Sequence, residues 1–142
     1  LKECFIPEYI AKKKFRGEWH DVRNVLFRGY VFLISDHIDE LFNELKKIPD
    51  FTKVIGKKKE TIYPLKDGGV EFLKTFGKED HIVNMSVGFI EGDRIHITEG
   101  PLQGREGLIA KIDRHKRIAY ISVNIFNEET TAKVGLEIIS KN

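Results

Sequence analysis

The amino-acid sequence predicts an α+β fold in which a mixed N-terminal half precedes a small all-β barrel. In the first half, apolar residues recur at helical spacing over residues 38–45 and again over 67–76, the pattern of amphipathic helices. From Phe89 onward no helical period is found, and short alternating stretches are separated by glycine and proline corners. Several short strands at this spacing are typical of a small β-barrel.

The first half is expected to contain several short strands. Phe5–Ile10 is the first, and Pro7 within it indicates a sheet edge or a bulge. A polar hairpin tip over residues 12–18 leads into a second strand at Asp21–Leu26. Tyr30–Ile34 is apolar on both faces, which predicts a central strand covered on two sides.

Two helices are expected to complete this half. Ser35 and Asp36 are suited to cap the first helix, which Pro49 ends before a short strand at Phe51–Ile55.

The second helix is expected near Asp67–Phe76, with Val70, Leu73 and Phe76 facing inward and Gly77 as its left-handed C′ residue. The next stretch, 78–88, lacks a sustained period and is expected to be a linker.

The second half contains the most informative segment, Gly92–Asp113. Ile95 and Ile97 alternate inward, Gly100 and Pro101 make a turn, Gly104 permits a positive φ, and Gly107 permits a sharp bend as one strand crosses another. By itself this pattern predicts a strand–loop–strand corner of a barrel. The strands expected after Phe89 are Arg94–Thr98, Gly107–Asp113, Ile118–Ile125, Thr130–Val134 and Leu136–Ile139.

Composition excludes several classes of protein. The 142 residues carry a net charge of +2, so any nucleic-acid surface must be local. A lone cysteine, Cys4, indicates a reducing, cytosolic setting, and we expect its thiol to be buried and structural. No apolar run reaches the roughly 18 residues that a membrane span needs.

The chain begins at Leu1 in what reads as the middle of an element, so we expect N-terminal residues to be missing.

Enzyme chemistry is not expected. The five histidines show no metal-ligand spacing and have no cysteine partners, and neither a P-loop nor a GxGxxG turn follows a strand. We therefore expect no catalytic residues, no metal and no cofactor.

Two motifs carry a family resemblance. Gly92–Asp113 closely resembles the KOW motif of the NusG family and of certain ribosomal proteins, and Leu26–Phe32 resembles the Phe-Pro-Gly-Tyr strand of the family's NGN domain, with Arg28 in place of the proline. Met85–Asp93 looks more like specialised paralogs, the LoaP-type antiterminators. The resemblance implies an NGN-like antiparallel sheet with helices over residues 1–77, a linker at 78–88, and an SH3-like KOW barrel over 89–142.

The resemblance also implies a polymerase-binding surface. An NGN domain docks on the clamp helices of the largest subunit of RNA polymerase, and the matching aromatic positions are Phe27, Tyr30 and Phe32. The alternative is that all three are core residues of a central strand. A cytoplasmic monomer is expected.

A second candidate surface is basic and lies between Arg105 and Arg117. Its candidate RNA-binding residues are Arg105, Lys111, Arg114, His115, Lys116 and Arg117. Exposed turns of small barrels are suited to nucleic-acid contact, although a solvated hairpin tip would have the same composition. The tips Lys12–Lys14 and Lys57–Lys59 are further basic loops, either solubilising or facing DNA or RNA.

The resulting hypothesis is a transcription elongation or antitermination factor. Its NGN-like half would bind RNA polymerase, and its barrel would contact nascent RNA, such as a hairpin. One alternative is a general NusG-like factor whose barrel binds proteins, such as the ribosome or a termination factor. Another is a ribosome-associated KOW protein.

Overall fold

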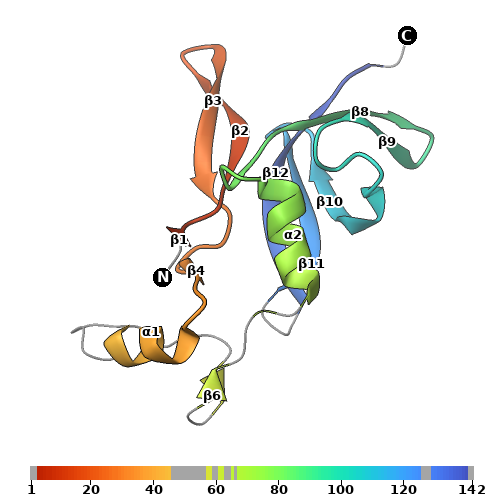
Figure 1. Cartoon of the computed structure of the whole chain (residues 1–142). Helices are drawn as coiled ribbons and strands as arrows, with labels where there is room; N and C mark the ends of the chain where they lie inside the picture. Colours follow the sequence, from red (N-terminus) through yellow and green to blue (C-terminus); the bar gives the residue numbers. More distant parts are fainter. Residues whose placement is uncertain are drawn as a thin grey trace.

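The computed structural model describes residues 3–45, 57–58, 61–62, 65, 67–125 and 129–140. Short strands and two described helices form an N-terminal part, and a curled five-stranded sheet forms the C-terminal part (Figure 1). The α+β class expected from the sequence is confirmed. In the described residues, no helix is long and apolar enough to cross a membrane.

The N-terminal part is built around the hairpin of β2 and β3. The three-stranded sheet has the order β3-β2-β7, with β2 antiparallel to β3 and parallel to β7, while β1 pairs only with β4 among the described strands. The elements are β1 (Glu3–Phe5), β2 (Glu8–Phe15), β3 (Glu18–Val25), β4 (Phe32–Ile34), α1 (Ile38–Leu45), β5 (Lys57–Lys58), β6 (Thr61–Ile62), α2 (Asp67–Gly77) and β7 (Ile82–Val83).

The C-terminal part is one sheet with the order β10-β11-β12-β8-β9. Its strands are antiparallel to their neighbours except β12 and β8, which run parallel with Leu136 opposite Ser86. The elements are β8 (Ser86–Glu91), β9 (Arg94–Glu99), a 3-10 turn η1 (Glu106–Leu108), β10 (Ile109–Asp113), β11 (Ile118–Asn124) and β12 (Glu129–Ile138).

The first expected strand and its hairpin are present with different bounds. The chain is interrupted at Pro7, so residues 5–10 belong to two strands, β1 and β2, and β2 continues through the lysines to Phe15, which leaves only Arg16 and Gly17 in the turn. The Pro7 carbonyl accepts a hydrogen bond from the Leu26 backbone N–H at 2.9 Å.

The Ser35 hydroxyl accepts a hydrogen bond from the His37 N–H at 3.0 Å, which closes a turn just before α1. The His37 carbonyl accepts the first helical hydrogen bond, from the Leu41 N–H at 3.0 Å, so His37 holds the N-cap position that was expected at Ser35 or Asp36.

The prediction of a central strand at Tyr30–Ile34 is wrong. Strand β4 has three residues, and the side chains of Val31, Leu33 and Ile34 are 55%, 39% and 43% exposed. Cys4 on the neighbouring strand β1 is also exposed, against the expected buried thiol. An apolar run cannot by itself distinguish a covered strand from an open edge.

Helix α2 packs through a different stripe from the expected one. Gly69, Phe72 and Phe76 are buried, whereas Val70 and Leu73 are only partly covered. A Cβ on Gly69 would lie 3.1 Å from Cγ1 of Ile125, so this glycine permits close packing of the helix on the C-terminal sheet.

The end of α2 also differs from the prediction. Gly77 is the last helical residue, and Lys78 adopts the left-handed φ of +52°. Lysine in this region costs some backbone strain that glycine would avoid.

The corner glycines are partly confirmed. Gly100 and Gly104 have positive φ values of +101° and +78°. Gly107 lies in η1, and nothing lies within 4 Å of a Cβ added there, so no close crossing at this position requires a glycine. The expected strands Thr130–Val134 and Leu136–Ile139 form the single strand β12.

Three other expectations concern positions that are not described or only partly so. The strand at Phe51–Ile55 and the helix stop at Pro49 lie outside the described residues. In the basic tip 57–59, Lys57 and Lys58 form strand β5 and pair with β6.

The two halves share one hydrophobic core. Its buried members include Tyr9, Ala11 and Phe76 from the N-terminal part, and Ile121 and Leu136 from the C-terminal part. Helix α2 lies across the sheet against β11 (Figure 1). Burial of apolar surface on both sides of the junction therefore stabilises the docked arrangement.

Strand β12 passes β2 at Gly135. A Cβ there would overlap the backbone carbonyl of Ile10 and lie 2.6 Å from Cγ of Met85. The backbones of the two halves can approach this closely only because residue 135 has no side chain.

We predict that Gly135→Ala lowers the free energy of unfolding by about 1–3 kcal/mol, because the added methyl group overlaps fixed backbone atoms. Urea unfolding of the whole chain measures the change. Gly107→Ala is the matched control, since nothing lies within 4 Å of its Cβ position, and it leaves stability unchanged or raises it by up to about 1 kcal/mol. Equal stability of the two variants would show that β12 and β2 do not approach closely in solution.

Candidate functional surfaces

The basic turn between β10 and β11 is a tight and well-defined loop. The Asp113 carboxylate accepts a hydrogen bond from the Lys116 N–H at 3.0 Å, and the Arg114 carbonyl accepts one from the Arg117 N–H at 3.3 Å. Arg117 adopts a φ of +58°. Arg114, His115 and Lys116 are exposed at this turn, so their charges remain hydrated and available to an anion.

Arg117 behaves differently from the rest of the turn. Its guanidinium carbon lies 4.0 Å from the ring centroid of Trp19 on β3, and its Nη1 lies 3.5 Å from Oε1 of Glu137 on β12. A guanidinium stacked on indole is a favourable cation–π contact. Arg117 therefore links the turn to the N-terminal hairpin.

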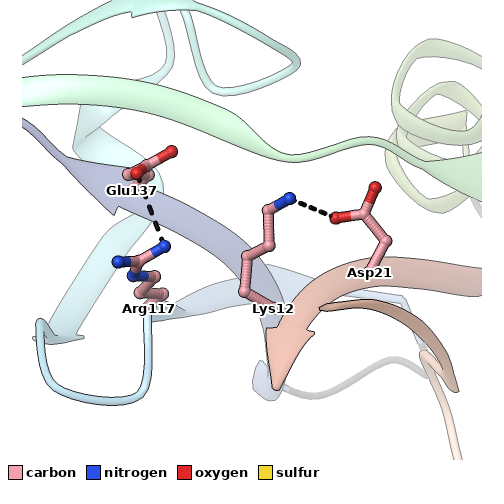
Figure 2. A network of polar contacts seen from close by, with 4 residues as sticks. All are labelled: Lys12, Asp21, Arg117 and Glu137. Carbon is pink, nitrogen blue, oxygen red and sulfur yellow. Dashed lines mark ion pairs between the residues drawn. The ribbon is translucent and has the colours of Figure 1, made fainter. Parts of the chain in front are cut away.

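Figure 2 shows the ion pair of Arg117 with Glu137 together with a second ion pair. In the second pair, Nζ of Lys12 on β2 lies 2.5 Å from Oδ1 of Asp21 on β3. Both pairs are partly exposed to solvent, so water screens each of them and neither contributes much stability alone. Each ion pair instead orients one basic side chain, Lys12 on β2 and Arg117 just before β11.

An open depression of about 450 Å³ lies beside the turn, lined by Arg114, His115, Arg117, Glu137 and Ile138. Four of these five side chains are polar, with two arginines and one carboxylate among them. The depression suits a hydrated anionic group better than an apolar ligand.

The other predicted basic residues lie in different surroundings. Arg105 donates a hydrogen bond to the Pro101 carbonyl at 3.4 Å and lies 5.5 Å from the ring centroid of Phe76 in α2. Lys111 lies 5.7 Å from the ring centroid of Tyr120. The structure therefore groups Arg114–Arg117 at the turn and gives Arg105 and Lys111 other neighbours.

Tyr120 lies between two lysines on the outer face of the C-terminal sheet. It is opposite Lys111 on β10 and Lys133 on β12, and the Lys133 amine is 5.8 Å from its ring centroid. On the N-terminal side, burial raises the pKa of the Tyr9 hydroxyl, with Tyr120 adding to the rise and Arg28 opposing it.

The three predicted aromatic residues are mostly in the core. Phe27 and Phe32 are 4% and 8% exposed, and Tyr30 is half-buried. The Phe27 ring lies 6.1 Å from that of Phe32 and 6.2 Å from that of Phe72 in α2. Phe27 and Phe32 thus hold the segment onto the core, and Tyr30 is the aromatic residue of the three with accessible surface.

Two residues of these surfaces escaped the sequence analysis. Trp19 is the only tryptophan of the chain, and its position two residues after the turn of a basic hairpin was a usable signal. Nothing in the sequence around Lys133 predicts its contact with Tyr120, because only the strand register places the two residues side by side. In the described part of the chain, no group of three or more His, Cys, Asp or Glu side chains is placed to hold a metal ion.

The fold defines a class of protein: a small α+β unit joined to a curled five-stranded β domain that carries a basic turn. The family model described as "Transcription termination factor nusG" matches residues 1–74, just over half of the chain. The chain belongs to the NusG family, as the two motifs indicated.

Related proteins match along nearly the whole chain. The transcription termination/antitermination protein NusG of Campylobacter jejuni is 24% identical over 141 residues, which cover 99% of this chain and 79% of that protein. The NusG protein of Buchnera aphidicola is 25% identical over 144 residues, covering 99% and 78%. That of Rickettsia felis is 23% identical over 143 residues, covering 100% and 74%.

We predict that Arg117→Ala makes Trp19 more accessible to acrylamide and shifts its emission to longer wavelength, because the guanidinium no longer covers the indole. As Trp19 is the only tryptophan, intrinsic fluorescence reports this contact alone. Arg114→Ala, on the same turn but exposed, is the control and leaves the emission unchanged. Identical quenching of the wild type and Arg117→Ala would mean that the hairpin and the turn are not in contact in solution.

Proposed function

We propose that this chain is a transcription elongation or antitermination factor that binds RNA polymerase through its N-terminal part and nascent RNA through its C-terminal part. Membership of the NusG family supports the role in transcription termination and antitermination. The exposed basic turn at 114–117 is the observation that carries the RNA contact. The protein acts in the cytoplasm, where transcription takes place in bacteria such as those of its relatives.

The proposed division of the chain follows the motifs. Residues 1–77 form the NGN-like polymerase-binding domain, 78–88 connect the domains, and 89–142 form the KOW domain. Two features of the connection matter for the mechanism: β7 (Ile82–Val83) pairs with β2, and β8 begins at Ser86. The connection is therefore held against both parts, and the KOW domain is positioned relative to the polymerase-binding half.

Binding, rather than bond-making chemistry, is the proposed mode of action. A factor attached to polymerase keeps its second domain at high effective concentration near the emerging RNA. Arg114, Lys116 and the neighbouring His115 supply cationic and hydrogen-bonding groups for phosphates and base edges. Arg105, Lys111 and Arg117 contribute from the flanks, where each already contacts an aromatic ring of this chain.

Tyr30 is the proposed direct contact to the clamp helices of the largest polymerase subunit. Phe27 and Phe32 shape this surface from beneath, since both are buried. The exposed apolar side chains of Val31, Leu33 and Ile34 on the same segment add apolar area. Aromatic residues with a surrounding apolar rim are common anchors of protein interfaces.

For RNA, we predict that Arg114→Ala and Lys116→Ala each weaken binding of an RNA hairpin. Each lost phosphate contact lowers the slope of log affinity against log salt by about 0.7–0.9. A gel-shift series over salt measures both quantities, with Lys74→Ala as the charge-matched control, since Lys74 is exposed on α2. Unchanged affinity and slope in both turn variants would exclude the RNA contact, and equal binding of scrambled RNA would favour a general NusG-like role.

For polymerase, we predict that Tyr30→Ala weakens binding of the whole chain to an isolated clamp-helix fragment by about tenfold or more, because an interface anchor contributes at least about 1.4 kcal/mol. Ile139→Ala is the control, since Ile139 is 46% exposed on the C-terminal part. Titration calorimetry gives the affinities. Equal affinity of Tyr30→Ala and wild type would place the polymerase contact elsewhere.

A further inference from the structure

The tip of the β2–β3 hairpin is strongly basic and projects from the rest of the molecule (Figure 1). Residues 12–20 contain three consecutive lysines and Arg16, with Glu18 as the only acid. Among the described residues, Lys12 is paired with Asp21, whereas Lys13 and Lys14 form no ion pair and are exposed. Unpaired positive charge is therefore concentrated at this tip.

The same tip exposes an aromatic side chain. Phe15 is 60% exposed, the most of the large exposed apolar residues of the described chain. The Arg16 guanidinium carbon lies 5.3 Å from its ring centroid, and the His20 ring lies 6.5 Å away in an edge arrangement. Cationic groups interleaved with an exposed ring are the features with which proteins hold unpaired bases and their phosphates.

The tip is also geometrically fixed. Arg16 and Gly17 have positive φ values of +52° and +81°, the conformation of a tight two-residue hairpin turn whose twist matches its strands. Eight residue pairs, from Glu8↔Val25 to Phe15↔Glu18, hold the hairpin together. The basic and aromatic side chains are thus presented on a stiff arm.

The stack of Trp19 on Arg117 joins this arm to the basic turn of the C-terminal part. Lys14 is directly opposite Trp19 in the hairpin, and directly opposed residues of a strand pair lie on the same face. Because Trp19 is 4.0 Å from the Arg117 guanidinium, Lys14 and the turn at 114–117 lie on adjoining parts of one surface.

We infer that the β2–β3 hairpin and the 114–117 turn form one RNA-binding surface that crosses the boundary between the two halves. Lys14 and Arg16 hold phosphates on one side, and Arg114 and Lys116 hold them on the other. Lys13 and Phe15 lie on the opposite face of β2 from Lys14, so the RNA passes round the tip of the β2–β3 hairpin and an unpaired base stacks on Phe15. The inference rests on the proposed RNA contact at the turn and extends it to the N-terminal half. It favours RNA with unpaired nucleotides, since the bases of a duplex cannot reach an exposed ring.

The decisive experiment measures binding of the whole chain to a fluorescein-labelled RNA hairpin with an unpaired loop, by anisotropy over a range of salt. We expect Lys13→Ala combined with Lys14→Ala to weaken binding by about tenfold and to lower the salt slope by about 0.7 for each lost single-strand contact. Lys74→Ala combined with Lys78→Ala, which removes two exposed lysines at and after the end of α2, is the matched control and leaves both quantities unchanged.

Phe15 is tested separately. Phe15→Ala should weaken binding of the looped hairpin by about tenfold, the usual range for loss of a base-stacking ring. It should leave binding of a fully paired RNA of the same length unchanged, and Phe15→Tyr should retain binding. An equal loss for looped and fully paired RNA would overturn the stacking role of Phe15.

Trp19 provides a readout that requires no label. Saturating RNA should change Trp19 fluorescence, because the ligand crosses the junction that Trp19 and Arg117 form. One outcome would overturn the shared surface and leave the proposed function intact. In it, the turn variants Arg114→Ala and Lys116→Ala weaken RNA binding, whereas the variants on the β2–β3 hairpin bind RNA as the wild type does and RNA does not change the Trp19 emission. If neither set weakens binding, the proposed RNA contact fails as well. Equally tight binding of duplex DNA, unaffected by Phe15→Ala, would show only a general attraction for polyanions.

Discussion

Strand β12 passes β2 at Gly135, and the placement of the β2–β3 hairpin beside the 114–117 turn depends on that close approach. β12 is paired with β11 from Glu129 to Gly135 and, from Leu136 to Ile138, runs parallel to β8. It therefore cannot move away from β2 without disturbing the C-terminal sheet. Any side chain at position 135 would overlap the carbonyl of Ile10. Because the two backbones meet there, Tyr9 and Ala11 are buried in one core with Leu136.

This docking determines which charged groups are engaged inside the molecule and which are free for a partner. Arg117 is held by Trp19 and Glu137, while Arg114 and Lys116 on the same turn extend into solvent. Arg105 is likewise placed over Phe76 of α2. A net charge of +2 is too small to attract nucleic acid over the whole surface. The position of a few unpaired cations therefore matters more than their total number.

The parts of the fold that follow from local chemistry could be predicted. The turn at Gly100 and Pro101 and the positive φ of Gly104 are present as predicted, because each effect acts within a few residues. The failures share one cause. The exposure of Val31 and its neighbours and the buried stripe of α2 depend on what packs against each element, and an apolar pattern does not identify its partner. For the same reason, two of the three predicted polymerase-binding aromatics proved to be buried.

The sequence by itself determined the α+β class, the order of the two halves, the turn at Gly100 and Gly104 and the family, because these rest on local periodicity and on motifs contiguous in the chain. Only the tertiary structure decided that Trp19 stacks on Arg117, that Lys133 lies beside Tyr120, and that Gly135 rather than Gly107 permits the close crossing. These contacts join residues that are distant in the chain. Strand register and the shared core bring them together, and neither can be read from one segment at a time.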